Sequence, residues 1–173
     1  MSWYTLLVLA VAAERVAELA VARRNAAWTL ARSGVEYGRG HYPVMVVLHT
    51  GLLACCLLEP VLAHRPFLPA LGWPMLTLVL LAQSLRWWCI TTLGRYWNTR
   101  VIVVPGARLV DAGPYRFLRH PNYVAVVVEI TALPLVHSAW LTAVVFTVAN
   151  AVLLMVRIRC ENAALDGRAV AAA

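Results

Sequence analysis

Long apolar stretches alternate with shorter polar segments along this chain. Most of these stretches are near the length that crosses roughly 30 Å of hydrocarbon as a helix. They comprise residues 2–22, 42–63, 67–93, 122–136 and 139–156. The pattern predicts an all-α integral membrane protein with about five transmembrane helices.

The last two apolar stretches are short, and only His137 and Ser138 separate them after Pro134. This spacing predicts a tight helical hairpin. Residues 94–121 form the longest segment that is not apolar. We therefore expect one membrane-embedded domain over residues 1–173, with a central loop at 94–121 and a C-terminal hairpin and tail at 122–168.

Composition supports a membrane protein and excludes several other classes. Hydrophobic residues make up 62% of the chain and charged residues 13%, whereas soluble domains have roughly 45–50% and 25%. No G-x-G-x-x-G segment is present, which excludes a soluble dinucleotide-type fold. The four Cys include no C-x-x-C pair and the His residues are scattered, so the sequence predicts no disulfide framework and no metal.

All 15 basic residues are Arg, and the net charge is +7. They alternate with apolar spans instead of gathering on one stripe, so we expect membrane lipids and no nucleic acid as partners. All except Arg15, Arg65 and Arg86 follow the first, third and fifth apolar stretches. The positive-inside rule then places the N-terminus outside, and both long loops and the C-terminus in the cytoplasm.

The end of the central loop is the first candidate for chemistry. Arg119 and His120 precede Pro121, a residue well suited to begin a helix. Free backbone N–H groups at that helix start, beside Arg119 and His120, would suit a carboxylate or phosphate. An interfacial Arg, an interfacial His and a helix-starting Pro explain the same pattern without a ligand. By physics alone both interpretations stay open.

A second candidate follows the last apolar stretch. Arg157 and Glu161 are four residues apart and share a helix face. On a soluble surface such a pair would contribute only about 0.3–0.5 kcal/mol. Here it continues an apolar helix out of the bilayer, where a charged pair more often has a function.

These segments together resemble the isoprenylcysteine carboxyl methyltransferase family, in its short bacterial branch. The resemblance combines Arg-His-Pro-x-Tyr at 119–123 with Arg-x-x-x-Glu at 157–161, and it extends to further segments at 14–18, 22–25, 36–38, 41–43 and 99–106. It implies an integral membrane enzyme that transfers a methyl group from S-adenosylmethionine to a lipophilic acceptor, leaving S-adenosylhomocysteine.

The resemblance also assigns roles to individual residues. Arg157 takes the position that holds the acceptor carboxylate, to which a guanidinium fork is geometrically suited. Glu161 takes a catalytic position that also contacts the cofactor. The cofactor-binding positions are Ala107, Arg108, Leu109, Val110, Tyr115, His120, Pro121, Asn122, Tyr123 and Glu161.

Two departures from the family pattern affect the acceptor. Asn162 stands where many relatives have a second acidic residue after the Glu, and the additional N-terminal spans of the longer eukaryotic members are missing. The acceptor is therefore left open between a prenylcysteine-type carboxylate and a phenolic or pyrone lipid hydroxyl. The carboxylate is already ionised at neutral pH, whereas the hydroxyl can need a base. The Ala-, Val- and Arg-rich composition is typical of a GC-rich bacterial genome and predicts the bacterial cytoplasmic membrane as the location.

Charged residues within the apolar stretches must be paired or lie near water, because an isolated charge there costs about 2.5–3.5 kcal/mol. We expect Arg86 to meet Glu129 or Glu59 beneath the site, and Glu14, Arg15 and Glu18 to fix helix packing. Trp97 and most other Trp residues are expected in an interfacial belt. A non-enzymatic transporter or scaffold subunit, whose Arg loops bind anionic lipid, is the rival function, and the oligomeric state is left open.

Overall fold

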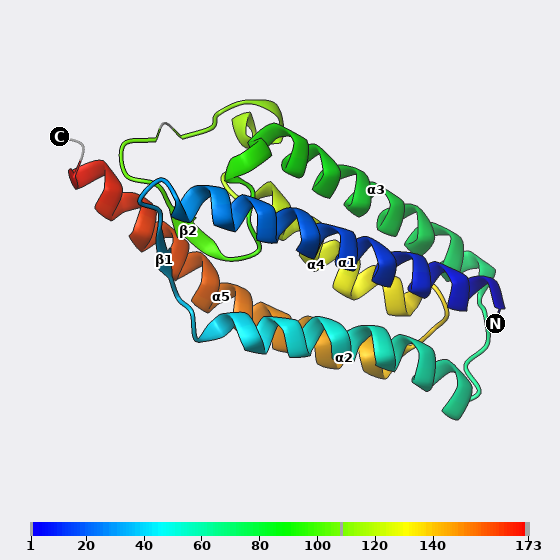
Figure 1. The fold of residues 1–173 in the computed structure, drawn as a ribbon. Coiled ribbons are helices and arrows are strands. Elements are labelled where there is room, and N and C mark those ends of the chain that lie inside the picture. Colours follow the sequence, from blue (N-terminus) through cyan, green and yellow to red (C-terminus); the bar gives the residue numbers. More distant parts are fainter. Residues whose placement is uncertain (1, 108, 172–173) are drawn as a thin grey trace.

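The computed structural model describes the backbone of residues 2–107 and 109–171, and within these ranges the side chains as far as Gly167. The described residues form five helices and a two-stranded sheet that lies at one end of the helical bundle (Figure 1). We refer to that end as the sheet end. The helices are α1 (Ser2–Leu30), α2 (His41–Leu62), α3 (Pro69–Leu93), α4 (Pro121–Leu135) and α5 (Trp140–Ala171).

Three helices are long and apolar enough to cross a membrane, namely α2, α3 and α5. Helix α4 is apolar but has only 15 residues, about 22 Å at 1.5 Å per residue. Helix α1 has the length, yet every membrane-length stretch of it includes Glu14, Arg15 and Glu18. The prediction of an all-α membrane protein is confirmed, and three of the five expected spans meet these criteria.

Two helices extend further than the apolar pattern predicts. Helix α1 continues past residue 22 to Leu30, and α5 continues past residue 156 to Ala171. In α1 the extension is held by Asn25, whose Nδ2 donates to the carbonyl oxygens of Gly94 at 3.0 Å and Trp97 at 2.7 Å. Polar contacts of this kind leave no trace in a hydropathy pattern.

The predicted hairpin between α4 and α5 is confirmed. Only Val136 to Ala139 separate the two helices, and they turn at the end of the bundle opposite the sheet (Figure 1). The Glu59 carboxylate of α2 caps the start of α5 by accepting from the backbone N–H of Leu141 at 3.2 Å and of Thr142 at 2.7 Å. This contact fixes α5 against α2.

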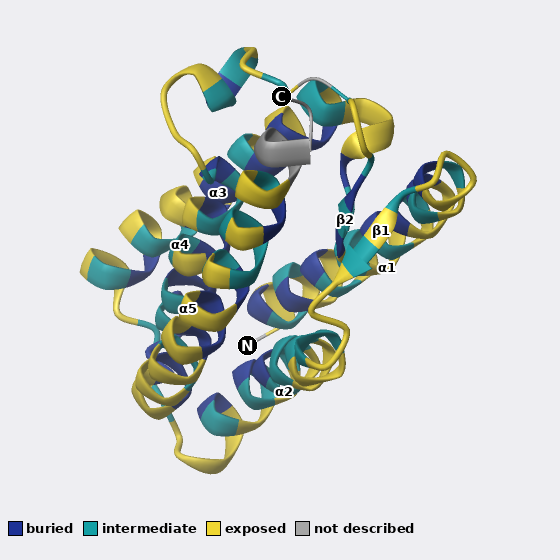
Figure 2. Cartoon of the chain, turned by 90° about the vertical axis from the view of Figure 1, so that its left-hand side faces the viewer, coloured by how far each residue is buried: buried dark blue, intermediate teal, exposed yellow. Residues whose placement is uncertain are grey.

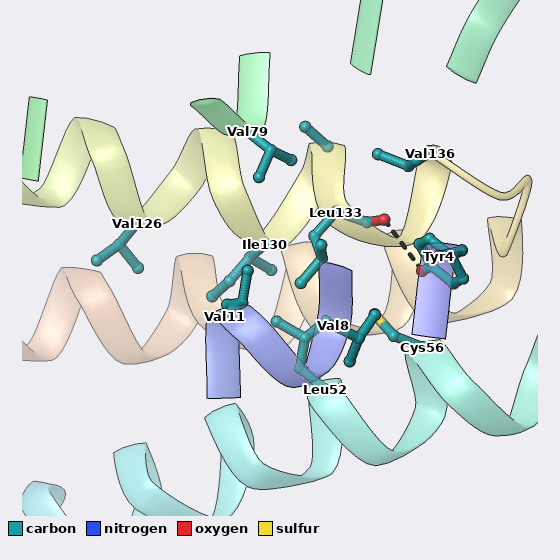
Figure 3. Packing of buried hydrophobic residues seen from close by; sticks show 11 residues of the cluster. Tyr4, Val8, Val11, Leu52, Cys56, Val79, Val126, Ile130, Leu133 and Val136 are labelled. Carbon is teal, nitrogen blue, oxygen red and sulfur yellow. Dashed lines mark hydrogen bonds between the residues drawn. The ribbon is translucent and has the colours of Figure 1, made fainter. Parts of the chain in front are cut away.

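The central core lies where α1, α2, α3 and α4 converge (Figure 3). Val8 of α1, Leu52 of α2 and Ile130 of α4 are buried together there. The fully buried Tyr4 hydroxyl donates to the carbonyl oxygen of Leu133 at 3.1 Å, close to the end of α4. Exposed residues lie on the outward faces of the helices (Figure 2), where many of them are large and apolar. This distribution suits a protein surrounded by lipid.

The sheet was not predicted from the sequence. Strand β1 (Val35–Tyr37) pairs antiparallel with β2 (Val101–Val103), and Glu36 lies opposite Ile102. Ala164, in the extension of α5, packs against Val101 and Val103. Short 3₁₀ turns, η1 (Gly94–Tyr96) and η2 (Gly113–Arg116), complete the segment between α3 and α4.

Candidate functional site

Two adjoining cavities lie toward the sheet end of the bundle. The polar cavity, about 130 Å³, is bounded by β2, the start of α4 and the extension of α5. The bundle cavity, about 150 Å³, lies among α1, α2, α4 and α5. Both cavities are lined by Trp97, Asn98, Asn122, Tyr123 and Arg157. These five side chains therefore form the boundary between the two spaces.

Tyr123 connects the two charged residues that the sequence singled out. The Arg157 Nε donates to the Tyr123 hydroxyl at 2.9 Å, and that hydroxyl donates to a carboxylate oxygen of Glu161. Arg157 and Glu161 thus act on the same side chain, one from each side, although they make no direct ion pair among the described contacts. Pro121 begins α4, as predicted, and so fixes the direction in which Tyr123 leaves the first turn.

Arg157 is buried, with 6% of its surface exposed. Besides Tyr123, it donates from Nη2 to the Thr99 carbonyl oxygen at 2.6 Å and from Nη1 to the Met45 sulfur at 3.0 Å. A guanidinium has five N–H groups, so two remain after these three contacts. No carboxylate of the described residues pairs with it. A buried guanidinium with two unused N–H donors is suited to bind an anion.

His120 lies on the polar cavity beside Glu161 and Asn162. Its Nε2 is 3.1 Å from the Asn162 Oδ1, and its Nδ1 is 3.7 Å from a Glu161 oxygen. An amide oxygen only accepts, so His120 Nε2 carries the proton in this contact. Asn162, the residue that departs from the family pattern, therefore orients His120.

Tyr115 of η2 also lines the polar cavity. Burial raises the pKa of its phenol above the ordinary value, with Cys89 as the next cause. The phenol is therefore protonated at neutral pH and is available as a hydrogen-bond donor.

Buried charges surround the inner part of the bundle cavity, which Arg15, Glu18 and Arg86 line. Arg86 donates to Glu129 and lies 3.6 Å from Glu18, which confirms one of the two predicted partners. The other, Glu59, lies near the far end of the bundle and pairs with Arg65 at 3.1 Å.

The sequence interpretation missed several residues of the boundary. Trp97 was assigned to an interfacial belt, but it is 3% exposed and lines both cavities. Asn98 has neither amide atom bonded, and the Asn122 Oδ1 is also buried without a partner among the described residues. Unpaired buried amides facing a cavity are what a polar ligand would satisfy. In the sequence, Trp97 and Asn98 directly precede the family segment at 99–106, and this was the one feature that could have indicated their place in the site.

Other residues with a predicted cofactor role lie elsewhere. Ala107, Leu109 and Val110 line neither cavity, and Leu109 is 67% exposed. Arg108 lies outside the described residues. Pro121 is buried at the helix start without lining either cavity. Tyr115, His120, Asn122, Tyr123 and Glu161 share the polar cavity, whereas the other five residues are not placed on it. The cofactor roles of all ten residues stay predictions.

The fold and site define a helical membrane protein in which a polar cavity at the bundle end adjoins a cavity inside the bundle. Comparison with known proteins identifies the class further. The model of the isoprenylcysteine carboxyl methyltransferase (ICMT) family matches residues 75–167. The chain belongs to this family, which makes it a methyltransferase-like membrane protein.

Two relatives match over most of their length. The "Uncharacterized protein YpbQ" of Bacillus subtilis is 40% identical over 167 residues, covering 96% of this chain and 97% of the relative. An "Uncharacterized protein" of Haemophilus influenzae is 22% identical over 155 residues, covering 88% of each chain. No solved structure matches the chain. The similarity to YpbQ therefore extends over nearly the whole chain.

Proposed function

We propose that the protein is an S-adenosylmethionine-dependent O-methyltransferase that acts on a lipophilic acceptor. The observation that carries this proposal is the shared boundary: Asn122, Tyr123 and Arg157 line a polar cavity on one side and a cavity within the bundle on the other. Direct methyl transfer needs a donor and an acceptor held in contact, from opposite sides of the transferred carbon. Two cavities that meet at a few side chains suit that requirement.

The residues of the polar cavity fit the cofactor chemically. Glu161 supplies an anion, which suits a cationic sulfonium cofactor and the hydroxyl and ammonium donors it carries. Tyr115 supplies a neutral hydroxyl, and the unpaired amides of Asn98 and Asn122 supply further donors and acceptors. When bound, the cofactor would supply the activated methyl group. Tyr123 holds Glu161 in place by donating to its carboxylate, and the His120 ring lies beside that carboxylate.

On the other side of the boundary, Arg157 would hold the acceptor oxygen. Its two remaining N–H groups suit a carboxylate, which is ionised at neutral pH and can attack the methyl carbon without a base. In such a step the carboxylate oxygen forms a bond to the methyl carbon while the sulfonium bond breaks. A phenolic or pyrone hydroxyl at the same place would give its proton to a base, for which we propose Glu161, joined to Arg157 through Tyr123. Arg157 would then stabilise the resulting anion.

The orientation that we propose follows from the Arg distribution. Most Arg residues lie in the segments of the sheet end, so the polar cavity would face the cytoplasm, where the cofactor is made, and the N-terminus would lie outside. The bundle cavity would then lie at the depth of the inner leaflet. An acceptor with an apolar tail can reach it from the bilayer.

Calorimetry with S-adenosylhomocysteine on the purified protein in detergent tests this function. We expect saturable binding that is lost in Glu161→Ala and in His120→Ala. Asp166→Ala is the matched control, since Asp166 lies on the same helix, is largely exposed and lines neither cavity. The control variant should bind as the wild type does.

A second measurement follows transfer of a labelled methyl group to N-acetyl-S-farnesylcysteine and to a long-chain alkylphenol. Transfer to either compound supports the enzyme, and the ratio of the two rates identifies the acceptor oxygen. Absence of S-adenosylhomocysteine binding in a folded sample would refute the proposal and favour a non-enzymatic transporter or scaffold subunit.

A further inference from the structure

The bundle cavity extends beyond Arg157 to two polar side chains that the transfer reaction does not use. His49 of α2 and Asn150 of α5 both line it. Neither residue lines the polar cavity. Polar groups in the middle of membrane helices are costly unless they have a partner, so their presence calls for a function.

The two side chains lie at the same depth of the bundle. Helices α2 and α5 run in opposite directions, and two contacts fix their register. Met45 meets Arg157 on the sheet side, while Gly51 lies so close to Phe146 that a Cβ there would be 3.4 Å from the ring. His49 and Asn150 fall between these contacts on their respective helices. Both therefore face one region of the cavity.

The free nitrogen of His49 is a hydrogen-bond acceptor. Its Nδ1 is 2.8 Å from the Met45 carbonyl oxygen, which can only accept, so Nδ1 carries the hydrogen. In the neutral imidazole the lone pair is then on Nε2. None of the described residues donates to Nε2.

Asn150 supplies the complementary group. It is 2% exposed, and its Oδ1 has no hydrogen-bond partner among the described residues. An amide can both donate and accept. A native structure satisfies such buried groups with protein, water or ligand. Here the open space next to Asn150 is the bundle cavity.

We propose that His49 and Asn150 form a second polar subsite, which binds a hydroxyl group of the methyl acceptor. This inference rests on the proposed methyltransferase function. A hydroxyl contacts both residues at once, since it donates its one hydrogen to His49 Nε2 and accepts from the Asn150 Nδ2, to which none of the described residues is bonded; it does not also donate to the Asn150 Oδ1. A carbonyl or a carboxylate cannot donate to a lone pair and does not fit.

The position of the subsite also restricts the acceptor. His49 follows Met45 by four residues, so it lies about 6 Å further along α2 than the residue that touches Arg157. The acceptor head therefore carries two oxygens: one near Arg157 that receives the methyl group, and a hydroxyl near His49. A six-membered ring with two separated oxygens has this form, whereas a prenylcysteine has no hydroxyl.

The test compares two probes that differ by one hydroxyl, meta-pentadecylphenol and the matching pentadecylresorcinol. Equilibrium binding of each is measured on protein saturated with S-adenosylhomocysteine in lipid nanodiscs. We expect the wild type to bind the resorcinol about tenfold more tightly, as one added hydrogen-bonded group warrants. His49→Leu and Asn150→Leu should each bring this ratio close to one.

Two further variants make the result specific. His49→Gln keeps a hydrogen-bond acceptor and should retain most of the preference. His41→Leu is the matched control, because His41 lies two turns earlier on α2 and lines neither cavity. Unchanged S-adenosylhomocysteine affinity in all variants shows that they are folded.

Equal affinity for both probes in the wild type would overturn the subsite, as would binding of neither probe. A preference that survives both His49→Leu and Asn150→Leu would also overturn it. These outcomes leave the methyltransferase proposal standing as long as S-adenosylhomocysteine binds. Loss of that binding in the wild type is the separate result that refutes the proposed function.

Discussion

Replacing Arg86 by Met should destabilise the protein strongly, and replacing Glu129 as well should restore most of the loss. Arg86 and Glu129 are 4% and 3% exposed, and the Arg86 guanidinium donates to the Glu129 carboxylate. Arg15 contacts Glu18 at 2.6 Å and Glu129 at 3.1 Å. Among these four side chains two are positive and two negative, and the partly exposed Glu14 lies 4.0 Å from Arg15 at the edge of the cluster. Removing one of the four therefore leaves a buried charge without its partner.

The expected magnitude follows from this balance. Breaking a buried ion pair from one side costs about 3–5 kcal/mol, because the partner stays buried without compensation. Arg86→Met leaves the buried carboxylates of Glu18 and Glu129 with Arg15 alone, which Glu14 also contacts. Glu129→Met leaves Glu18 as the only buried carboxylate near both Arg15 and Arg86 among the described residues. The double variant keeps the neutral Arg15–Glu18 pair, and we expect it within about 2 kcal/mol of the wild type. The coupling energy should then be at least about 4 kcal/mol.

SDS titration in mixed micelles measures the free energy of unfolding of the wild type, of the two single variants and of the double variant. Arg65→Met is the control: the Arg65 side chain is 34% exposed in its pair with Glu59, so the loss should stay below about 1 kcal/mol. Neither Arg86 nor Glu129 lines the polar cavity, and folded variants should bind S-adenosylhomocysteine normally. Additive costs in the double variant, or a small cost of Arg86→Met, would refute the reasoning.

Two further variants test the boundary and the hairpin. Tyr123→Phe removes the hydroxyl that joins Arg157 to Glu161. We expect S-adenosylhomocysteine to bind roughly tenfold more weakly in calorimetry, because one charge-assisted hydrogen bond is lost. Unchanged affinity would contradict this role of Tyr123. Glu59→Ala removes the cap from the start of α5. We expect the free energy of unfolding, measured by SDS titration, to fall by about 1–2 kcal/mol. An unfolding curve equal to that of the wild type would show that the cap contributes nothing.

The apolar pattern and the charges within it predicted much of this fold. The hairpin after Pro134 and the helix start at Pro121 both follow from local rules about proline and span length. The contact of Arg86 with Glu129 follows from the cost of an unpaired charge among apolar residues. In each case a single strong physical constraint acts on residues that are identifiable from the sequence.

The sheet and the Trp97 position could not be predicted in the same way. Strands β1 and β2 have three residues each and pair across more than 60 positions of the chain, so no local periodicity marks them. Trp97 lies near the end of an apolar stretch, where an interfacial position is the common outcome. Its burial depends on the extension of α1, from which Asn25 donates to its carbonyl oxygen at 2.7 Å.

The unequal lengths of α4 and α5 explain why the site lies where it does. Both helices leave the same hairpin, but α4 has 15 residues and α5 has 32, about 22 Å against 48 Å. Where α4 begins at Pro121, α5 is beside it at Arg157 and continues past it. That continuation carries Glu161 and packs through Ala164 on β2. The short helix therefore exposes its first turn, and the long one supplies the wall of the polar cavity above it. Lengthening α4 by a turn at its start would fill that cavity, so the site depends on the mismatch between the two helices.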